Sequence, residues 1–387
     1  MTHVSLTSRG PRLSQLDSLR GLAALFVVFN HFALAVPDEI RLAVSGEMLW
    51  SPEAWLTPWP WLRFTPLRLL VSNGAPVDLF FVLSGFVLAL PLTQAGQPPV
   101  LPFLIKRFCR IYIPFAVSIL FVVLTYALVS VAPMPAASTW LNAKLHVPDG
   151  AAIFWHLAMT GGTNEMWLNP VMWSLVHEMR ISIVMPLLFL GVRRFGSIPV
   201  LIGCTLISVL ASVGNKDLAI GSWQMTLHVL WMFSAGVTLA YNRAAIAVQL
   251  TKCNRHLFSF LVLVAVGLLV VPFHRIWGDF LIGMGAALLI ALCLPATRLS
   301  RALMVPPLLW LGRISYSLYL IHFPILLFGI TGGFFSRPSV TLLIIILLAA
   351  DLTFRFVEAP AQRLGAGLAG KAPSTSAPDQ PRPATPS

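Results

Sequence analysis

The chain has 387 residues, of which 57% are hydrophobic and 10% charged, and its formal net charge is +12. A soluble domain carries about 25% charged residues, so this composition predicts an all-α, polytopic membrane protein. The basic residues lie at the ends of apolar runs instead of on one stripe, which argues against nucleic acid as a partner. The four cysteines are scattered without a C-x-x-C pair, and we expect neither a disulfide framework nor a metal site.

The first apolar run, LDSLRGLAALFVVFNHFALAV, places Arg20 and His31 eleven residues apart. At about 100° per residue, eleven steps make three turns plus about 20°, so both side chains lie on one helix face, about 16 Å apart. Arg20 is then at the helix entrance, one turn after Asp17, and His31 is well inside the apolar layer. Buried ionisable residues in a membrane are costly and indicate function. Interface anchoring by Arg20 and a helix–helix hydrogen bond by His31 are the alternatives.

Ten apolar runs are long enough to cross a bilayer. With the N-terminus in the cytoplasm and alternating crossings, 18 of the 26 lysine and arginine residues fall on the cytoplasmic side. We therefore expect about ten transmembrane helices with both termini cytoplasmic, and a short interfacial or re-entrant segment near 151–160. The ten runs lie near residues 20–36, 69–92, 108–132, 171–191, 197–213, 223–241, 257–273, 279–296, 309–330 and 338–357.

Two long outside loops, 37–68 and 133–170, are rich in tryptophan. Tryptophan is typical of the aromatic belt at a membrane interface. The same rings would also suit a lid that faces a sugar-like or lipid-linked acceptor. The residues are Trp50, Trp55, Trp59 and Trp61 in the first loop, and Trp140, Trp155 and Trp167 in the second.

A second cationic cluster, Lys106, Arg107 and Arg110, begins the third apolar run. Arg107 and Arg110 are three residues apart and share a helix face. Paired arginines suit phosphate binding, although anchoring at the cytoplasmic interface explains them as well. An acyl thioester on a phosphate-bearing carrier arm fits a slot with cations at its mouth and His31 near its end.

Several further polar residues lie within apolar runs. Three roles are open for Glu178: it orients His31, binds an acceptor, or forms a buried pair with Arg180 or His177. For the others we expect hydrogen bonds between helices, with some of the side chains lining a site. These others are Asp17, Asp78, Ser84, Trp173, Ser315, Tyr316 and His322.

These motifs together resemble the acyltransferase-3 family of integral-membrane O-acyltransferases. The resemblance runs in family order from about residue 14 to residue 364. We accordingly expect a transmembrane acyltransferase domain over 1–364, no fused soluble catalytic domain, and a disordered cytoplasmic tail over 365–387, rich in Pro, Ser and Ala. The matching segments are LDSLRGLAAL with Arg20 and His31, VDLFFVLSGFVLAL, the R-x-x-R of Arg107 and Arg110, WSLVHE, LGRISYSLYLIHFPI, and the Glu-x-Pro of Glu358 and Pro360.

The resemblance implies acyl transfer, most commonly of acetyl, from cytoplasmic acyl-CoA to a hydroxyl of a glycan or another exported acceptor. It implies a catalytic His31, which we group with Glu178, and a donor site at Arg20, Arg107 and Arg110. Glu358 fills the family's Glu-x-Pro position, for donor binding or helix organisation. We expect no bound cofactor and a bacterial inner-membrane location, and the oligomeric state stays open, a homo-oligomer included.

Two alternatives stay open at this stage. His31 acts as a general base on the acceptor hydroxyl or forms an acyl-histidine intermediate. The rival class of protein is a transporter or flippase of a glycan or lipid-linked substrate, with a non-enzymatic membrane scaffold as a further reading. Release of free CoA that requires both acceptor and His31 would distinguish the enzyme from a carrier.

Overall fold

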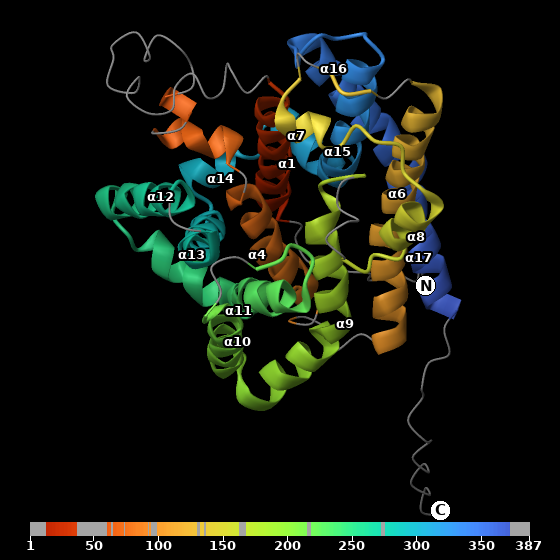
Figure 1. The fold of residues 1–387 in the computed structure, drawn as a ribbon. Helices are drawn as coiled ribbons and strands as arrows, with labels where there is room; N and C mark the ends of the chain where they lie inside the picture. Colours follow the sequence, from red (N-terminus) through yellow and green to blue (C-terminus); the bar gives the residue numbers. More distant parts are fainter. Residues whose placement is uncertain are drawn as a thin grey trace, which may run out of the picture.

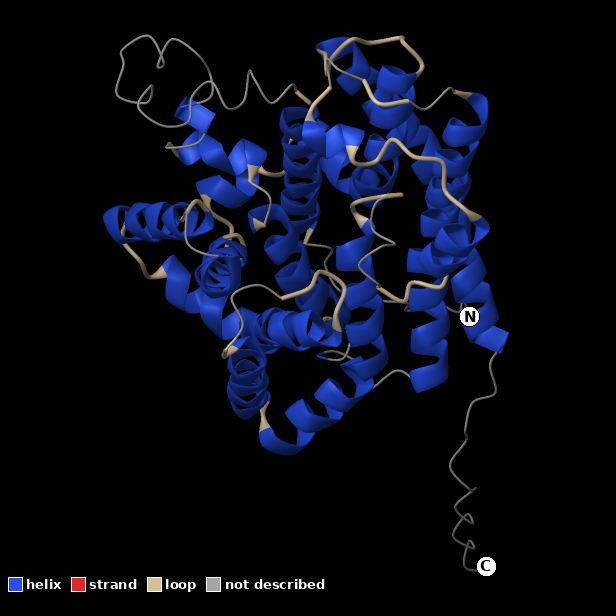
Figure 2. Ribbon diagram, viewed as in Figure 1, coloured by secondary structure: helices blue, strands red, loops and turns tan. Residues whose placement is uncertain are grey.

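The computed structural model describes residues 13–36, 60–62, 65–72, 74–91, 93, 99–129, 132–134, 137–161, 168–214, 218–271 and 275–371. This described part is helical and contains no strand (Figure 2). The longer helices are α1 Ser14–Ala35, α4 Ala75–Ala89, α6 Val100–Leu128, α9 Met172–Phe195, α10 Ser197–Ser212, α11 Trp223–Thr251, α12 Arg255–Leu269, α13 Arg275–Leu292, α15 Pro306–Thr331, α16 Val340–Thr353 and α17 Ala359–Lys371.

The helices form two groups around α1 and α4 (Figure 1). Helix α1 packs against α15 and α4, α15 packs against α16 and α6, and α17 packs along α6. On the other side, α4 contacts α11 and α13, which in turn contact α10 and α12. Short elements connect these helices: η3 Pro66–Val71, α7 Thr139–Asn142, α8 Gly150–Leu157, α14 Arg298–Ala302 and the π-helix η5 Phe354–Glu358.

A helix covers each of the ten apolar runs, and the all-helical prediction is confirmed for the described residues. Five helices are long and apolar enough to cross a membrane: 14–35, 100–128, 172–195, 306–331 and 340–370. The helices at 75–89, 197–212, 255–269 and 276–292 are apolar but shorter. The count of ten crossings and the cytoplasmic termini therefore stay predictions, as does the interfacial position of α8.

The predicted start of the tail at residue 365 is wrong. Helix α17 continues to Lys371, and the remaining predicted tail, 372–387, lies outside the described residues. Gly365 lies inside α17, where the helix packs closely on α6. A Cβ at Gly365 would lie 2.9 Å from Cys109 Cβ on α6, so a side chain at this position would push the two helices apart.

Helices α1 and α15 touch backbone to backbone. A Cβ added at Gly21 would lie 2.5 Å from the backbone nitrogen of Gly312, which leaves room for glycine alone. Small residues let membrane helices approach in this way. Residues ascend in the same direction along both helices, because Arg20 bonds to Ser315 and His31 to His322. The two helices are thus parallel, as the predicted first and ninth crossings must be.

A proline in α15 is compensated by a side chain from the segment that precedes α9. Pro324 has no N–H to donate to the Leu320 carbonyl one turn earlier. Asn169 donates its Nδ2–H to that carbonyl at 3.2 Å. Asn169 is fully buried, so the loop that carries it is fixed against the middle of α15. This bond stabilises α15 close to His322.

We predict that Gly21→Ala lowers stability, because the new methyl group meets the Gly312 backbone, which cannot rotate away. Overpacking of this kind costs about 1–3 kcal/mol. The measurement is the thermal unfolding midpoint of the detergent-purified protein. Gly267→Ala in α12 is the matched control, because nothing lies within 4 Å of its Cβ and alanine favours a helix. Equal midpoints for Gly21→Ala and wild type would contradict the proposed contact.

Candidate active site

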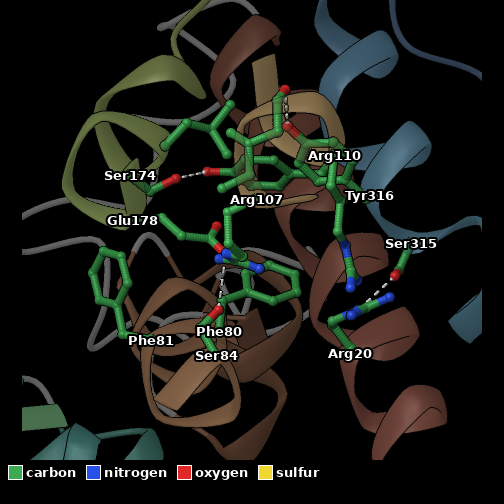
Figure 3. A pocket seen from close by; sticks show the side chains of 13 residues that line it. Arg20, Phe80, Phe81, Ser84, Arg107, Arg110, Ser174, Glu178, Ser315 and Tyr316 are labelled. Carbon is green, nitrogen blue, oxygen red and sulfur yellow. Dashed lines mark hydrogen bonds and ion pairs between the residues drawn. The ribbon is translucent and has the colours of Figure 1, made fainter. Parts of the chain in front are cut away.

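The polar residues that the sequence singled out gather in two cavities. The first, here called the arginine cavity, lies between α1, α4, α6, α9 and α15 (Figure 3). A smaller cavity that shares five of its residues extends it towards Asp17. The polar residues that line the arginine cavity are Arg20, Ser84, Arg107, Arg110, Ser174, Glu178, Ser315, Tyr316 and Tyr319.

Three guanidinium groups face one carboxylate in the arginine cavity. Arg107 donates from Nη2 to Glu178 Oε1 at 2.6 Å. Arg20 donates from Nε to Ser315 Oγ at 2.9 Å, and Figure 3 shows the Arg110 guanidinium turned towards that of Arg20. Neither Arg20 nor Arg110 forms an ion pair in the described part of the chain. The cavity thus carries excess positive charge and suits an anionic ligand.

Glu178 lines the arginine cavity, and its contacts there bear on two of the three roles that were left open for it. Its hydrogen bonds among the described residues go to Arg107 and Ser84, not to His31. The alternative of a buried pair with Arg180 or His177 is not seen among the described residues. Arg180 donates to the carbonyls of Thr160, Gly221 and Ser222. His177 Nδ1 is hydrogen-bonded to Thr226. The contact between Arg107 and Glu178 could not be predicted from helix periodicity, because the two residues are 71 positions apart in the sequence.

The second cavity, here called the histidine cavity, has a volume of about 500 Å³. His31 lies on its wall, 7% exposed, with its ring stacked on that of Trp140 at a centroid distance of 5.3 Å. Ser138 holds Trp140 in place because it caps α7 and also donates to the Leu34 carbonyl at the end of α1. The other polar or aromatic lining residues are Arg68, Ser72, Asp78, Lys144, Trp173 and Asp279.

Lys144 adds a cation to the histidine cavity. Its ammonium lies over the Trp140 ring, 5.1 Å from the centroid. Burial lowers the pKa of Lys144 to about 8, because the charged form loses hydration. Lys144 is therefore mostly protonated at neutral pH, and its ammonium loses the proton near pH 8.

The catalytic candidate His31 is hydrogen-bonded to a second histidine. His31 Nδ1 lies 2.7 Å from His322 Nε2, and His322 Nδ1 lies 3.0 Å from the Leu318 carbonyl. Both rings are buried. The sequence analysis named His322 only as a candidate lining residue. Its contact with His31 was not predicted, because the two residues are 291 positions apart in the sequence.

A layer of aromatic rings separates the two cavities. Phe81 lines the arginine cavity and Trp173 lines the histidine cavity, and their ring centroids are 6.1 Å apart. Beside them, Phe80 packs edge-on against Tyr319, and Tyr319 lies 6.4 Å from the His322 ring. These rings therefore lie where the two cavities come closest to sharing a wall.

Glu358 lies apart from both cavities. Its carboxylate accepts from Ser317 at 2.6 Å and from Gln362 at 3.0 Å, and it is 1% exposed. The residue ends the π-helix η5, two positions before Pro360, whose missing N–H disfavours a regular helix here. These contacts join α15 to α17; donor binding by Glu358 stays a prediction.

Most predicted site residues therefore lie in one of the two cavities. Ser84, Ser315 and Tyr316 line the arginine cavity, while Asp78 and Trp173 line the histidine cavity. Trp50, Trp55, Trp59 and Trp167 lie outside the described residues. Sequence reasoning missed Lys144 and Asp279 as site residues, although Asp279 is a lone acidic residue in an apolar run, which is itself a functional signal.

The family assignment rests on a comparison that covers most of this architecture. The model of a family described as "Acyltransferase domain" matches residues 13–352, which include both cavities and all the arginines and histidines discussed. The chain belongs to this acyltransferase family. No solved structure matches it.

Three curated relatives extend the comparison. This acyltransferase is 25% identical over 333 residues to YrhL of Bacillus subtilis, which carries the name of a peptidoglycan O-acetyltransferase; the match covers 76% of this chain and 51% of YrhL. It is 30% identical over 95 residues to O-acetyltransferase OatA of Staphylococcus aureus, covering 23% and 15%. It is 31% identical over 86 residues to peptidoglycan O-acetyltransferase OatA of Listeria monocytogenes, covering 21% and 14%. The chain thus spans about half or less of these relatives.

We predict that Lys144 reacts with an amine-selective reagent with a midpoint near pH 8, because its neutral form is populated earlier than that of an ordinary lysine. Peptide mass spectrometry of the labelled protein, recorded from pH 6 to 11, measures the midpoint. Lys144→Arg is the control that assigns the signal, since arginine keeps the charge and does not react. A midpoint near the ordinary lysine value of about 10.4 would show that the ammonium is fully hydrated.

Proposed function

We propose that the chain is a membrane O-acyltransferase that moves an acyl group, most simply acetyl, from cytoplasmic acyl-CoA to a hydroxyl of an exported glycan. The strongest support is that one helix contributes a residue to each of the two cavities. Helix α1 carries Arg20 in the arginine cavity and His31 in the histidine cavity. This arrangement along α1 suits a donor that binds the arginines with the phosphates at one end and presents the thioester at its other end to the imidazole of His31.

The arginine cavity is the proposed donor site. Arg20 and Arg110 have no acidic partner within ion-pair distance in the described part of the chain, so phosphate oxygens would balance their charge. Arg107, paired with Glu178, holds the third guanidinium in position. The thin pantetheine arm would then reach past the aromatic layer towards His31.

His31 is the proposed general base. Its neutral imidazole accepts the proton of the acceptor hydroxyl as that oxygen attacks the thioester carbonyl. The new C–O bond forms, the C–S bond breaks, and the departing thiolate takes the proton back from His31. An acyl-histidine intermediate would instead place the acyl group on the ring first.

The histidine cavity is the proposed acceptor site. Trp140 and Trp173 offer aromatic faces for a sugar ring, and Asp78 and Lys144 offer hydrogen-bond partners for its substituents. The names of the relatives direct attention to peptidoglycan as the acceptor class. With the N-terminus in the cytoplasm, this cavity opens away from the cytoplasm, where an inner-membrane enzyme meets an exported glycan.

We predict that His31→Ala lowers acyl transfer at least about 100-fold, because a general base contributes roughly 10²–10⁴-fold to rate. Membranes containing the protein are given radiolabelled acetyl-CoA and peptidoglycan fragments, and labelled product and free CoA are both counted. His256→Ala, an exposed histidine at the start of α12, is the matched control. Transfer at wild-type rate by His31→Ala would reject the assignment, and glycan movement without CoA release would favour a transporter.

We predict that Arg110→Gln raises the KM for acetyl-CoA about tenfold with a smaller change in kcat, because the lost contact is with the unreactive phosphates. One charge-assisted hydrogen bond is worth about 1.5–3 kcal/mol. Initial rates against acetyl-CoA concentration separate the two constants. Arg301→Gln, on exposed α14, controls for loss of positive charge elsewhere. An equal KM for both variants would place the donor outside the arginine cavity.

A further inference from the structure

The hydrogen bond between His31 and His322 fixes which nitrogen carries the proton. The Leu318 carbonyl is an acceptor only, so His322 Nδ1, 3.0 Å away, must be protonated and donate to it. In a neutral His322 ring the other nitrogen, Nε2, then carries a lone pair. His322 Nε2 lies 2.7 Å from His31 Nδ1, so its lone pair faces His31.

The surroundings of His322 favour its neutral form. The ring is 0% exposed, with the Leu318 carbonyl at 3.0 Å and the Tyr319 ring at a centroid distance of 6.4 Å. None of the ion pairs in the described part of the chain involves His322. A charged imidazolium without a carboxylate partner would lose its hydration with little in return.

The two rings are arranged for a direct nitrogen-to-nitrogen hydrogen bond. Their planes differ by 18°, and their centroids are 5.0 Å apart, well beyond the 2.7 Å between the nitrogens. The rings therefore meet edge to edge in nearly one plane instead of lying face to face. Because an imidazole lone pair lies in the ring plane, His31 Nδ1–H points at the lone pair of His322.

We propose that His322 is a positioning residue that holds His31 in the Nδ1–H tautomer and so reserves His31 Nε2 as the base. This inference rests on the proposed function of His31. In the described part of the chain no group forms a hydrogen bond to His31 Nε2, and His31 lies on the wall of the histidine cavity. The role that a carboxylate fills in many histidine-dependent enzymes falls here to a neutral histidine.

The same bond becomes stronger during the reaction. When His31 Nε2 takes the hydroxyl proton, the ring becomes an imidazolium, and its Nδ1–H donates to His322 as a charge-assisted bond. His322 thus stabilises the charged state of His31 more than the neutral state. The backbone carbonyl of Leu318 and the stacked Trp140 ring keep both imidazoles in orientation.

The first test uses two variants of similar size. His322→Leu removes the acceptor, while the Oε1 of His322→Gln accepts from His31 Nδ1. We expect His322→Leu to lower kcat about 100-fold or more with the KM for acetyl-CoA within twofold of wild type, and His322→Gln to recover at least tenfold of that loss. His256→Leu is the surface control. Equal kcat values for the Leu and Gln variants would overturn the positioning role.

The second test does not depend on activity. Solid-state ¹⁵N NMR of histidine-labelled protein in lipid reports the protonated nitrogen of each ring, and His31→Ala assigns the His31 signals. We expect a protonated Nδ1 and an unprotonated Nε2 for His31 in the wild type, and a mixture of tautomers in His322→Leu. A His31 ring protonated on Nε2 in the wild type would overturn the proposal even if every variant folds poorly.

The outcomes also separate this inference from the proposed function. Loss of transfer in His31→Ala with normal transfer in His322→Leu would reject the positioning role alone. Normal transfer in His31→Ala would reject the function of His31, whatever the NMR shows. Unchanged binding of acetyl-CoA to His322→Leu, measured by calorimetry, shows that the arginine cavity remains folded in that variant.

Discussion

The backbone contact between Gly21 and Gly312 sets the geometry of the rest of the site. It brings two parallel helices together with so little space that their register is fixed. Within that register Arg20 meets Ser315 and His31 meets His322, one pair near each end of the shared face. Side-chain chemistry at both cavities therefore depends on residues that carry no functional group at all.

The sequence predicted what depends on helix periodicity and on hydropathy. The placing of Arg20 and His31 along one face needs only 3.6 residues per turn, and the apolar runs mark their own helices. It did not predict which distant residues meet. A role beside His31 was one of three left open for Glu178, and its charge is balanced by Arg107 on α6.

Other errors have local causes. The tail boundary was placed at residue 365 because the segment that follows is rich in Pro, Ser and Ala and lacks apolar periodicity, but Gly365 continues α17 where it packs on Cys109. Lys144 went unnoticed because one lysine in a loop has no periodicity to mark it. Its importance comes from Trp140, which a capped four-residue helix holds against His31.

The two cavities serve different parts of the proposed reaction. The arginines need an environment in which cations are stable, whereas the His31–His322 pair depends on the neutral state of two imidazoles. The aromatic layer of Phe81 and Trp173 separates these environments.

The net positive charge of the arginine cavity has a consequence for turnover. Coenzyme A keeps all of its phosphates after the acyl group has left, so in the proposed reaction Arg20 and Arg110 hold the spent carrier as firmly as the loaded one. Discrimination between the two has to come from the acyl group itself. The rate of the proposed reaction in a cell would then follow the ratio of acyl-CoA to free CoA and not the acyl-CoA concentration alone, and acylation of the acceptor would depend on the metabolic state of the cytoplasm.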